Sequence, residues 1–190
     1  MGESGAKWRT PAKRPGWGAC GPRRTVSPTK HLSGPETPGD GTGSLAVAFM
    51  GEYQHQLDEK GRLIIPARFR EELGSPFVVT RGLDRCLFAF PVAEWANVEA
   101  KLRSLPLTQA DARAFVRLLM AGASPVELDR AGRALVPPHL RQYAGLQRDV
   151  VVLGVGSRVE IWDQAAWESY AAQAQGSFEA IAEKIVGLGL

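Results

Sequence analysis

An aspartate, a glycine and an arginine recur at one spacing in two places in the chain. Residues 57–66 have the sequence LDEKGRLIIP, and residues 128–137 have the sequence LDRAGRALVP. A carboxylate at the start of a turn accepts hydrogen bonds from the turn amides and lies within reach of the arginine four positions later. A guanidinium fixed in this way offers a planar fork of donors that suits a phosphate or a guanine edge. Each copy therefore predicts a hairpin turn that positions one arginine.

The candidate nucleic-acid-binding residues follow from these two turns and from the cations near them. Arg62 and Arg133 are the primary candidates, and Asp58, Gly61, Asp129 and Gly132 are predicted to shape the turns. Lys60, Arg68 and Arg85 join the candidates by charge and placement. A second interpretation stays open at this point: the Asp–Arg pairs could be ion pairs that hold the hairpins and face no partner.

The motifs belong to a longer internal repeat with an offset of 71 to 72 residues. Each copy predicts a strand, a turn, a strand ending at proline, a short helix, two strands and a helix. A unit of about 45 residues buries too little surface to be stable alone, so the two copies are expected to pack around a pseudo-twofold axis. Helical patterns at residues 108–122 and 178–186 are expected to serve packing or subunit contact.

Composition excludes several classes of function. The chain has two cysteines and three dispersed histidines, which argues against a disulfide framework and a metal site. It has no apolar run of membrane-spanning length and no secretory leader pattern, so a cytoplasmic protein is expected. It lacks a nucleophile elbow, a P-loop and a metalloprotease signature, which predicts that the protein is not an enzyme and needs no cofactor. Cys86 lies in an apolar run and is expected in the core.

Residues 1–48 differ in amino-acid composition from the rest of the chain. They contain nine glycines, six prolines and four large aliphatic residues, a composition typical of disorder. Seven basic and three acidic residues give this tail a formal charge of +4, which leaves −1 for the remainder of the chain's +3. Any polyanion must therefore bind the folded part through a local basic patch. Folded-type sequence begins at Phe49, which also suggests that Met50 or a nearby codon is the true start.

From Phe49 to about Ser177 the sequence resembles the MraZ family of bacterial transcriptional regulators, which are built of two SpoVT-AbrB-type units. The resemblance rests on the segment FMGEY at residues 49–53, on LDEKGRLIIP, and on the second Asp-x-x-Gly-Arg motif at residues 129–133. Two departures stand out. The first 48 residues are foreign to the family pattern, and the second turn has Arg130-Ala131 where the first has Glu59-Lys60.

The resemblance implies an α+β, mainly β fold: two tandem AbrB-like swapped-hairpin units that form a pseudo-twofold β-barrel with peripheral helices. The expected boundaries are a tail at 1–48, repeat units at 51–98 and 123–170, connecting helices at 99–122 and a C-terminal helix at 171–190. It also implies ring-shaped homo-oligomers such as octamers. These would bind repeated sites in double-stranded promoter DNA of the division and cell-wall gene cluster, including the family's own gene, in the nucleoid. The family's DNA-contacting arginine corresponds to Arg62, and its second-motif counterpart to Arg133.

The sequence is also compatible with two alternatives to a regulator. The first is an AbrB-like, antitoxin-like module that binds a protein partner, with which the C-terminal amphipathic pattern is compatible. The second is a dinucleotide-binding enzyme, since Gly154-Val155-Gly156-Ser157 follows a predicted strand. The residues after that loop indicate another strand where a helix is required, so the enzyme is discounted. Trp162 and Trp167 match Phe90 and Trp95 of the first copy, which favours a packing role for them.

Overall fold

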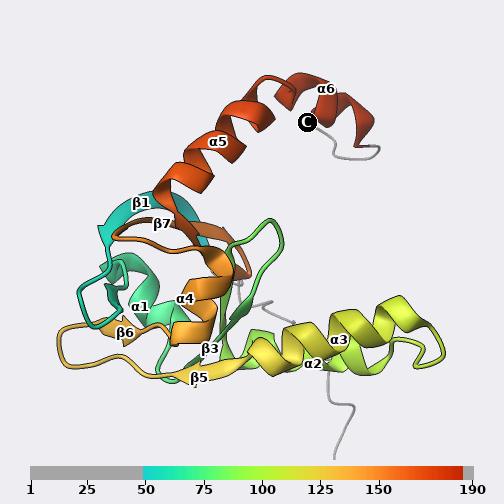
Figure 1. Ribbon diagram of the computed structural model, residues 1–190, viewed down its shortest axis with the longest axis horizontal. Helices are drawn as coiled ribbons and strands as arrows, with labels where there is room; N and C mark the ends of the chain where they lie inside the picture. Colours follow the sequence, from blue (N-terminus) through green and yellow to red (C-terminus); the bar gives the residue numbers. More distant parts are fainter. Residues whose placement is uncertain (1–48, 186–190) are drawn as a thin grey trace, which may run out of the picture. The chain divides into compact units, whose positions relative to one another are not determined.

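Both halves of the chain fold into the same order of elements in a computed structural model that describes residues 49–185 (Figure 1). The first half contains β1 (Phe49–Gln56), β2 (Arg62–Ile64), α1 (Ala67–Leu73), β3 (Phe77–Arg81), β4 (Leu87–Pro91) and α2 (Val92–Arg103). The second contains β5 (Ser124–Val126), β6 (Arg133–Leu135), α4 (Pro138–Ala144), β7 (Asp149–Gly156), β8 (Arg158–Asp163) and α5 (Gln164–Gln175). Helix α3 (Ala110–Gly122) joins the halves, and α6 (Phe178–Lys184) follows α5.

Part of the sequence prediction lies outside the described residues, namely the tail at 1–48 and the last residues, 186–190. Within the described part, the connecting helix begins at Ala110 and its N-cap is Gln109, one residue after the predicted cap, Thr108. The expected C-terminal helix is divided, because α5 runs to Gln175 and α6 starts at Phe178 after Gly176. None of the helices in residues 49–185 combines the length and apolar sequence that crossing a membrane requires.

Proline and glycine set the bounds of the short helices. Pro66 and Pro137 precede α1 and α4, where a missing backbone N–H costs nothing because the first turn of a helix leaves its N–H groups unpaired. Gly74 and Gly145 follow the two helices. In both halves, a proline before the helix and a glycine after it turn the chain from the ribbon strand back toward the main sheet.

The two repeats exchange strands within one sheet. Six antiparallel strands lie in the order β1-β7-β8-β4-β3-β5, so β1 of the first repeat pairs with β7 of the second, and β5 pairs with β3. The fourth strands of the two repeats, β4 and β8, pair at the centre. Strands β2 and β6 form a separate two-stranded ribbon. The fold is thus mixed α and β with a mainly antiparallel sheet.

The expected barrel is not confirmed, because the sheet does not close. Strands β1 and β5 are its two edges, and only isolated bridges, Leu57 to Leu63 and Leu128 to Ala134, link those edges to the ribbon. The reason is local: each edge strand ends just before an Asp-Gly turn, so a single residue pair is left to continue the ladder across the turn.

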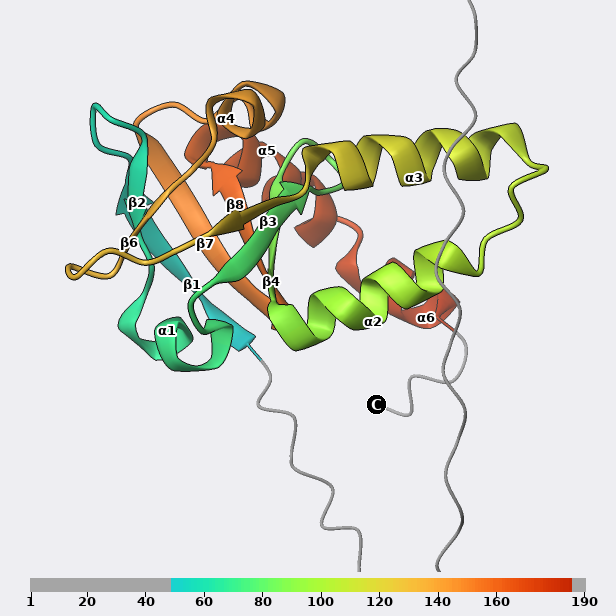
Figure 2. The same cartoon turned by 90° about the horizontal axis from the view of Figure 1, so that it is seen from below.

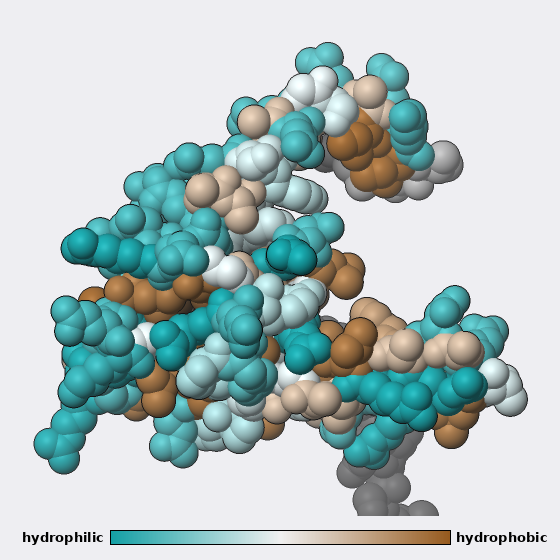
Figure 3. Space-filling view, in the orientation of Figure 1, coloured by the Kyte–Doolittle hydropathy of each residue, from teal (hydrophilic) through white to brown (hydrophobic). Residues whose placement is uncertain are grey.

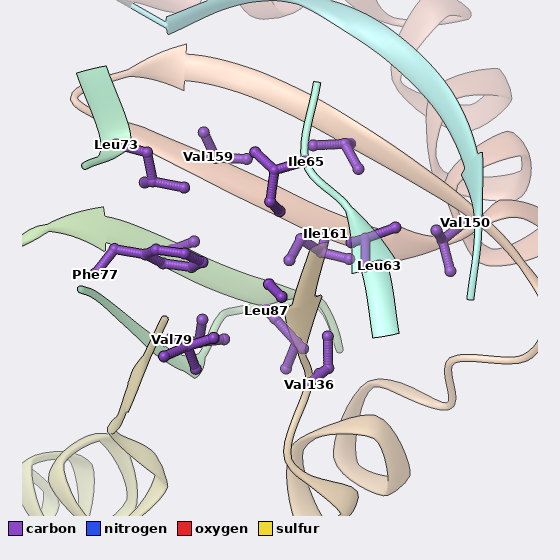
Figure 4. Packing of buried hydrophobic residues seen from close by; sticks show 14 of the residues in the cluster. Leu63, Ile65, Leu73, Phe77, Val79, Leu87, Val136, Val150, Val159 and Ile161 are labelled. Atoms are coloured by element: carbon purple, nitrogen blue, oxygen red, sulfur yellow. The ribbon is translucent and has the colours of Figure 1, made fainter. Parts of the chain in front are cut away.

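The main core lies between the sheet and the ribbon. Leu63 and Ile65 from the β2 segment and Val136 from the β6 segment point into it, together with Leu87 and Ile161 of the central strands (Figure 4). All five side chains are fully buried or nearly so. At about 25 cal/mol per Å² of apolar surface, burial of this kind supplies the main favourable free energy of folding, and here it requires both repeats.

A smaller core lies on the other face of the sheet. Cys86, Val151, Leu153 and Trp162 are buried there, and Phe88 and Trp167 pack against them. Burial raises the pKa of the Cys86 thiol, so it stays protonated and unreactive at neutral pH. The predictions that Cys86 lies in the core and that the two tryptophans serve packing are confirmed.

Candidate nucleic-acid interface

The first turn, between β1 and β2, is closed by Asp58. Its Oδ1 atom accepts hydrogen bonds from the backbone N–H groups of Lys60 (3.0 Å) and Arg62 (2.9 Å), and its Oδ2 atom accepts one from Arg62 Nε (2.6 Å). The backbone closes the same turn, because Gly61 N–H donates to the Asp58 carbonyl and Asp58 N–H to the Arg62 carbonyl. One carboxylate therefore shapes the turn and orients the guanidinium, as the spacing predicted.

The second turn, between β5 and β6, repeats this arrangement atom for atom. Asp129 Oδ1 accepts from the backbone N–H groups of Ala131 (2.9 Å) and Arg133 (3.0 Å), and Asp129 Oδ2 accepts from Arg133 Nε (2.8 Å). The side chains of Arg62 and Arg133 keep 30% and 32% of their surface exposed. Each arginine is therefore anchored at one edge and open to solvent at another.

The two turns are joined through the ribbon. In the β2–β6 register Arg62 lies opposite Leu135, and Arg133 lies opposite Ile64. The ladder continues at both ends, where Ile65 N–H donates to the Gly132 carbonyl and Val136 N–H donates to the Gly61 carbonyl. Each turn is therefore hydrogen-bonded to the other repeat. Both turns lie at the end of the sheet opposite the α2–α3 pair (Figure 2), and hydrophilic side chains cover this edge in Figure 3.

Two of the cations near the turns, Arg70 and Arg141, support them in a way that the sequence does not predict. Arg70 Nε donates to the Ile65 carbonyl (2.7 Å) and Arg141 Nε to the Val136 carbonyl (3.2 Å). Their guanidinium groups lie against the turn glycine of the other repeat, Arg70 against Gly132 and Arg141 against Gly61. A Cβ atom on either glycine would collide with the arginine, and both glycines have positive φ. The matching positions of Arg70 and Arg141 in the repeat were the available signal.

The remaining candidates are placed less uniformly. Lys60 is exposed in the first turn, and Arg68 is exposed on α1, which follows β2. Arg85 is exposed in the loop between β3 and β4, beside the positive-φ residue Asp84. That loop hydrogen-bonds to α4 through Tyr143, whose hydroxyl donates to the Gly82 carbonyl (2.7 Å). The structure therefore places Lys60 with Arg62 and puts Arg85 in a different loop.

The two turns have different surroundings. A hollow of about 630 Å³ opens beside the first turn, and Asp58, Glu59, Arg141, Gln147 and Arg148 are among the residues that line it. The first turn itself carries Glu59-Lys60, and the second carries Arg130-Ala131. Two arginines of the second repeat and two carboxylates of the first turn therefore line the same hollow. The surroundings thus add to the difference between the turns that the sequence shows.

The Asp–Arg pairs also fix the charge states of the turns. The side-chain hydrogen bond of Arg133, followed by that of its backbone N–H, lowers the pKa of Asp129 to about 2. The pKa of Asp58 is lowered as well, first by the backbone N–H of Arg62. The pKa of the Arg133 guanidinium is raised, chiefly by its hydrogen bond to Asp129. The carboxylates of Asp58 and Asp129 therefore stay ionised across the physiological range of pH.

Replacing Arg133 with glutamine should raise the pKa of Asp129 from about 2 toward the ordinary value, since Arg133 supplies the largest cause of the shift. The pKa of Asp129 is lower in the folded state than the value of about 3.9 expected in the unfolded state. The ion pair therefore stabilises the fold fully above about pH 3.9, and this stabilisation is lost as the pH falls toward 2. Carboxyl NMR titration measures the pKa directly. Arg130→Gln removes a neighbouring charge and should leave it unchanged; an Asp129 pKa that stays near 2 in Arg133→Gln would contradict the assignment.

The described residues offer no obvious metal site. Nowhere in residues 49–185 do three His, Cys, Asp or Glu side chains gather as a metal ion would need. The feature that repeats between the two halves is instead a pair of hydrogen-bonded, partly exposed guanidinium groups. Such groups bind phosphates or base edges.

The fold and the site define a class of protein: two tandem repeats share one antiparallel sheet. Each repeat contributes one strand and one arginine-bearing turn to a β-ribbon. Residues 48–118 and 119–188 each match the model of the family described as "MraZ protein, putative antitoxin-like". The chain is 58% identical over 142 residues to the transcriptional regulator MraZ of Acetivibrio thermocellus, covering 75% of this chain and 99% of that protein. It is 61% identical over 138 residues to that of Moorella thermoacetica, covering 73% and 96%. The chain belongs to the MraZ family.

Proposed function

We propose that this protein is a transcriptional regulator that binds double-stranded DNA sequence-specifically through the β2–β6 ribbon. The observation that carries the proposal is the pair of guanidinium groups, each held by an aspartate at one edge and exposed at another. A two-stranded ribbon fits the major groove, and arginine is the commonest reader of guanine there. The relatives named transcriptional regulators support the same conclusion. Arg62 and Arg133 would contact DNA directly, with Lys60 and Arg68 nearby and Arg85 as an outlying contact.

The acting form would be a ring-shaped homo-oligomer, such as an octamer. Its support is the apolar surface that one chain leaves exposed, on α6 (Phe178 and Ile181) and on α3 (Phe115 and Leu118). Figure 3 shows brown surface at the upper right, where α6 lies. Surfaces of this kind are typical of subunit contacts. A ring would present several ribbons to repeated DNA sites, so that modest single contacts combine into tight binding.

The target would be repeated sites in the promoter of the division and cell-wall gene cluster, including the protein's own gene, and the protein would act in the cytoplasm at the nucleoid. This part rests on the resemblance to the family. The domain limits follow the repeats, with units at 51–98 and 123–170 joined by 99–122. We expect no enzymatic activity, because the sequence lacks a nucleophile elbow, a P-loop and a metalloprotease signature.

Fluorescence anisotropy tests the proposal with the full chain and two labelled duplexes, the DNA upstream of its own gene and a scrambled duplex of equal composition. We expect selective binding of the upstream DNA. Affinity should fall steeply between two salt concentrations, because phosphate contacts release counterions. Equal binding of both duplexes would refute sequence-specific recognition.

The second candidate is an antitoxin-like module that binds a protein partner. It is favoured by the family's description and by the exposed apolar residues of α6. A stoichiometric second protein that co-purifies from the native source, and that is lost when Phe178 and Ile181 are changed to serine, would support this candidate. Purification of the chain alone, with selective DNA binding, would favour the regulator.

A further inference from the structure

The ribbon presents more than arginines on its outer face. Side chains alternate along a strand, so Leu63 and Ala134 point into the core while their neighbours point outward. The outward set on β2 is Arg62 and Ile64, and on β6 it is Arg133 and Leu135. Ile64 is 43% exposed and Leu135 55% exposed. Two large aliphatic side chains therefore lie in solvent on the same face as the two candidate DNA-binding arginines.

The register pairs each aliphatic side chain with one arginine. Leu135 lies opposite Arg62, and Ile64 lies opposite Arg133. Directly opposed residues in an antiparallel pair have Cα atoms about 5 Å apart, so the two side chains of a pair reach the same region of space. Two residues along a strand span about 6.8 Å, which is close to two base-pair steps of about 3.4 Å. The ribbon thus offers two equivalent pairs, each of one donor fork and one apolar side chain.

This pairing matches the chemistry of the major groove. Guanine presents two acceptors there, which suit a guanidinium, and thymine presents the C5 methyl group, which is the apolar feature of the groove. We propose that Ile64 and Leu135 are specificity-determining residues that contact thymine methyl groups beside the guanines bound by Arg133 and Arg62. The inference deepens the proposed function and rests on it.

A second copy of the chain is a poorer occupant for this face. A stable protein interface buries about 800 Å² on each partner and excludes charge from its centre. Here the two aliphatic side chains alternate with two guanidinium groups, each already bound to an aspartate. The apolar area is small, and it is divided by charge. DNA accepts both components at once, since its groove carries acceptors, methyl groups and flanking phosphates.

Uracil-substituted DNA tests the inference, because uracil differs from thymine only by the missing methyl group. The full chain is titrated with the duplex from upstream of its own gene and with the same duplex made with deoxyuridine. We expect wild type to bind the uracil duplex about fourfold more weakly for each methyl group contacted. Ile64→Ala and Leu135→Ala should bind thymine DNA more weakly and discriminate less between the two duplexes. The matched control is Leu83→Ala, which shortens an aliphatic side chain with 57% exposure outside the ribbon.

Each outcome decides a different point. Selective binding by wild type with equal affinity for the thymine and uracil duplexes would overturn the inference and leave the proposed function standing. Equal binding of the upstream and scrambled duplexes would overturn both. A change of oligomer mass in Ile64→Ala, measured by light scattering, would assign this face to subunit contact and overturn the inference. Ile64→Val guards against misfolding, because it keeps the β-branched shape and should retain part of the discrimination.

Discussion

Arg62→Ala is expected to weaken binding to the upstream duplex by about 10- to 100-fold, which is the range for loss of one arginine-to-guanine contact. The turn should survive the change. Asp58 Oδ1 keeps its two backbone donors, and the Gly61 and Asp58 backbone bonds do not use the arginine side chain. Circular dichroism and light scattering should therefore show the fold and molecular mass of wild type, while anisotropy shows the loss of selectivity.

One control variant and one measurement distinguish a contact to a base from a general loss of positive charge. Arg103→Ala makes the same change of net charge on α2, where Arg103 is 76% exposed and paired with Glu99, and should leave DNA binding unaltered. The salt dependence adds a second distinction. If Arg62 reads a base, the salt slope stays near that of wild type, and if it binds a phosphate the slope falls by about one. Wild-type affinity in Arg62→Ala would show that Arg62 is not a DNA contact.

The turns could be predicted from sequence because their hydrogen bonds are local. Asp58 and Arg62 are four residues apart, and every partner of the carboxylate lies between them, so spacing alone indicates the geometry. The match of Arg70 and Arg141 in the repeat suggests a shared role, but their contacts could not be predicted, for the opposite reason. Each packs on a glycine of the other repeat, and that contact exists only after the repeats have docked. The barrel implied by the family resemblance is not confirmed, and the strand pattern in the sequence does not show where a hydrogen-bond ladder stops.

The pseudo-symmetry of the two repeats also breaks at the smaller core. The second repeat has Arg158 and Glu160 at the positions that hold Cys86 and Phe88 in the first, an offset of 72 residues. Glu160 is only 8% exposed, and its carboxylate is hydrogen-bonded. It accepts hydrogen bonds from Arg158 Nε (3.0 Å), Arg158 Nη2 (2.7 Å) and Trp162 Nε1 (3.0 Å). The Arg158 guanidinium also stacks over the Phe88 ring, 4.4 Å from its centroid.

Arg158→Ala is therefore expected to lower the free energy of unfolding by about 2–4 kcal/mol, the range for a buried ion pair that loses one partner, reduced because Arg158 is itself 31% exposed. The cost arises because Glu160 stays buried with only Trp162 Nε1 (3.0 Å) and the weak donor Cys86 Sγ (4.0 Å) as side-chain partners within residues 49–185. Urea denaturation at fixed protein concentration measures this loss, because the stability of an oligomer depends on concentration.

Replacing the pair with the first repeat's residues, Arg158→Cys with Glu160→Phe, should recover most of the lost stability, because no charge is then left buried. In Arg103→Ala, whose ion pair is exposed, the loss should stay below about 0.5 kcal/mol. A loss this small in Arg158→Ala would show that the buried carboxylate does not depend on its arginine.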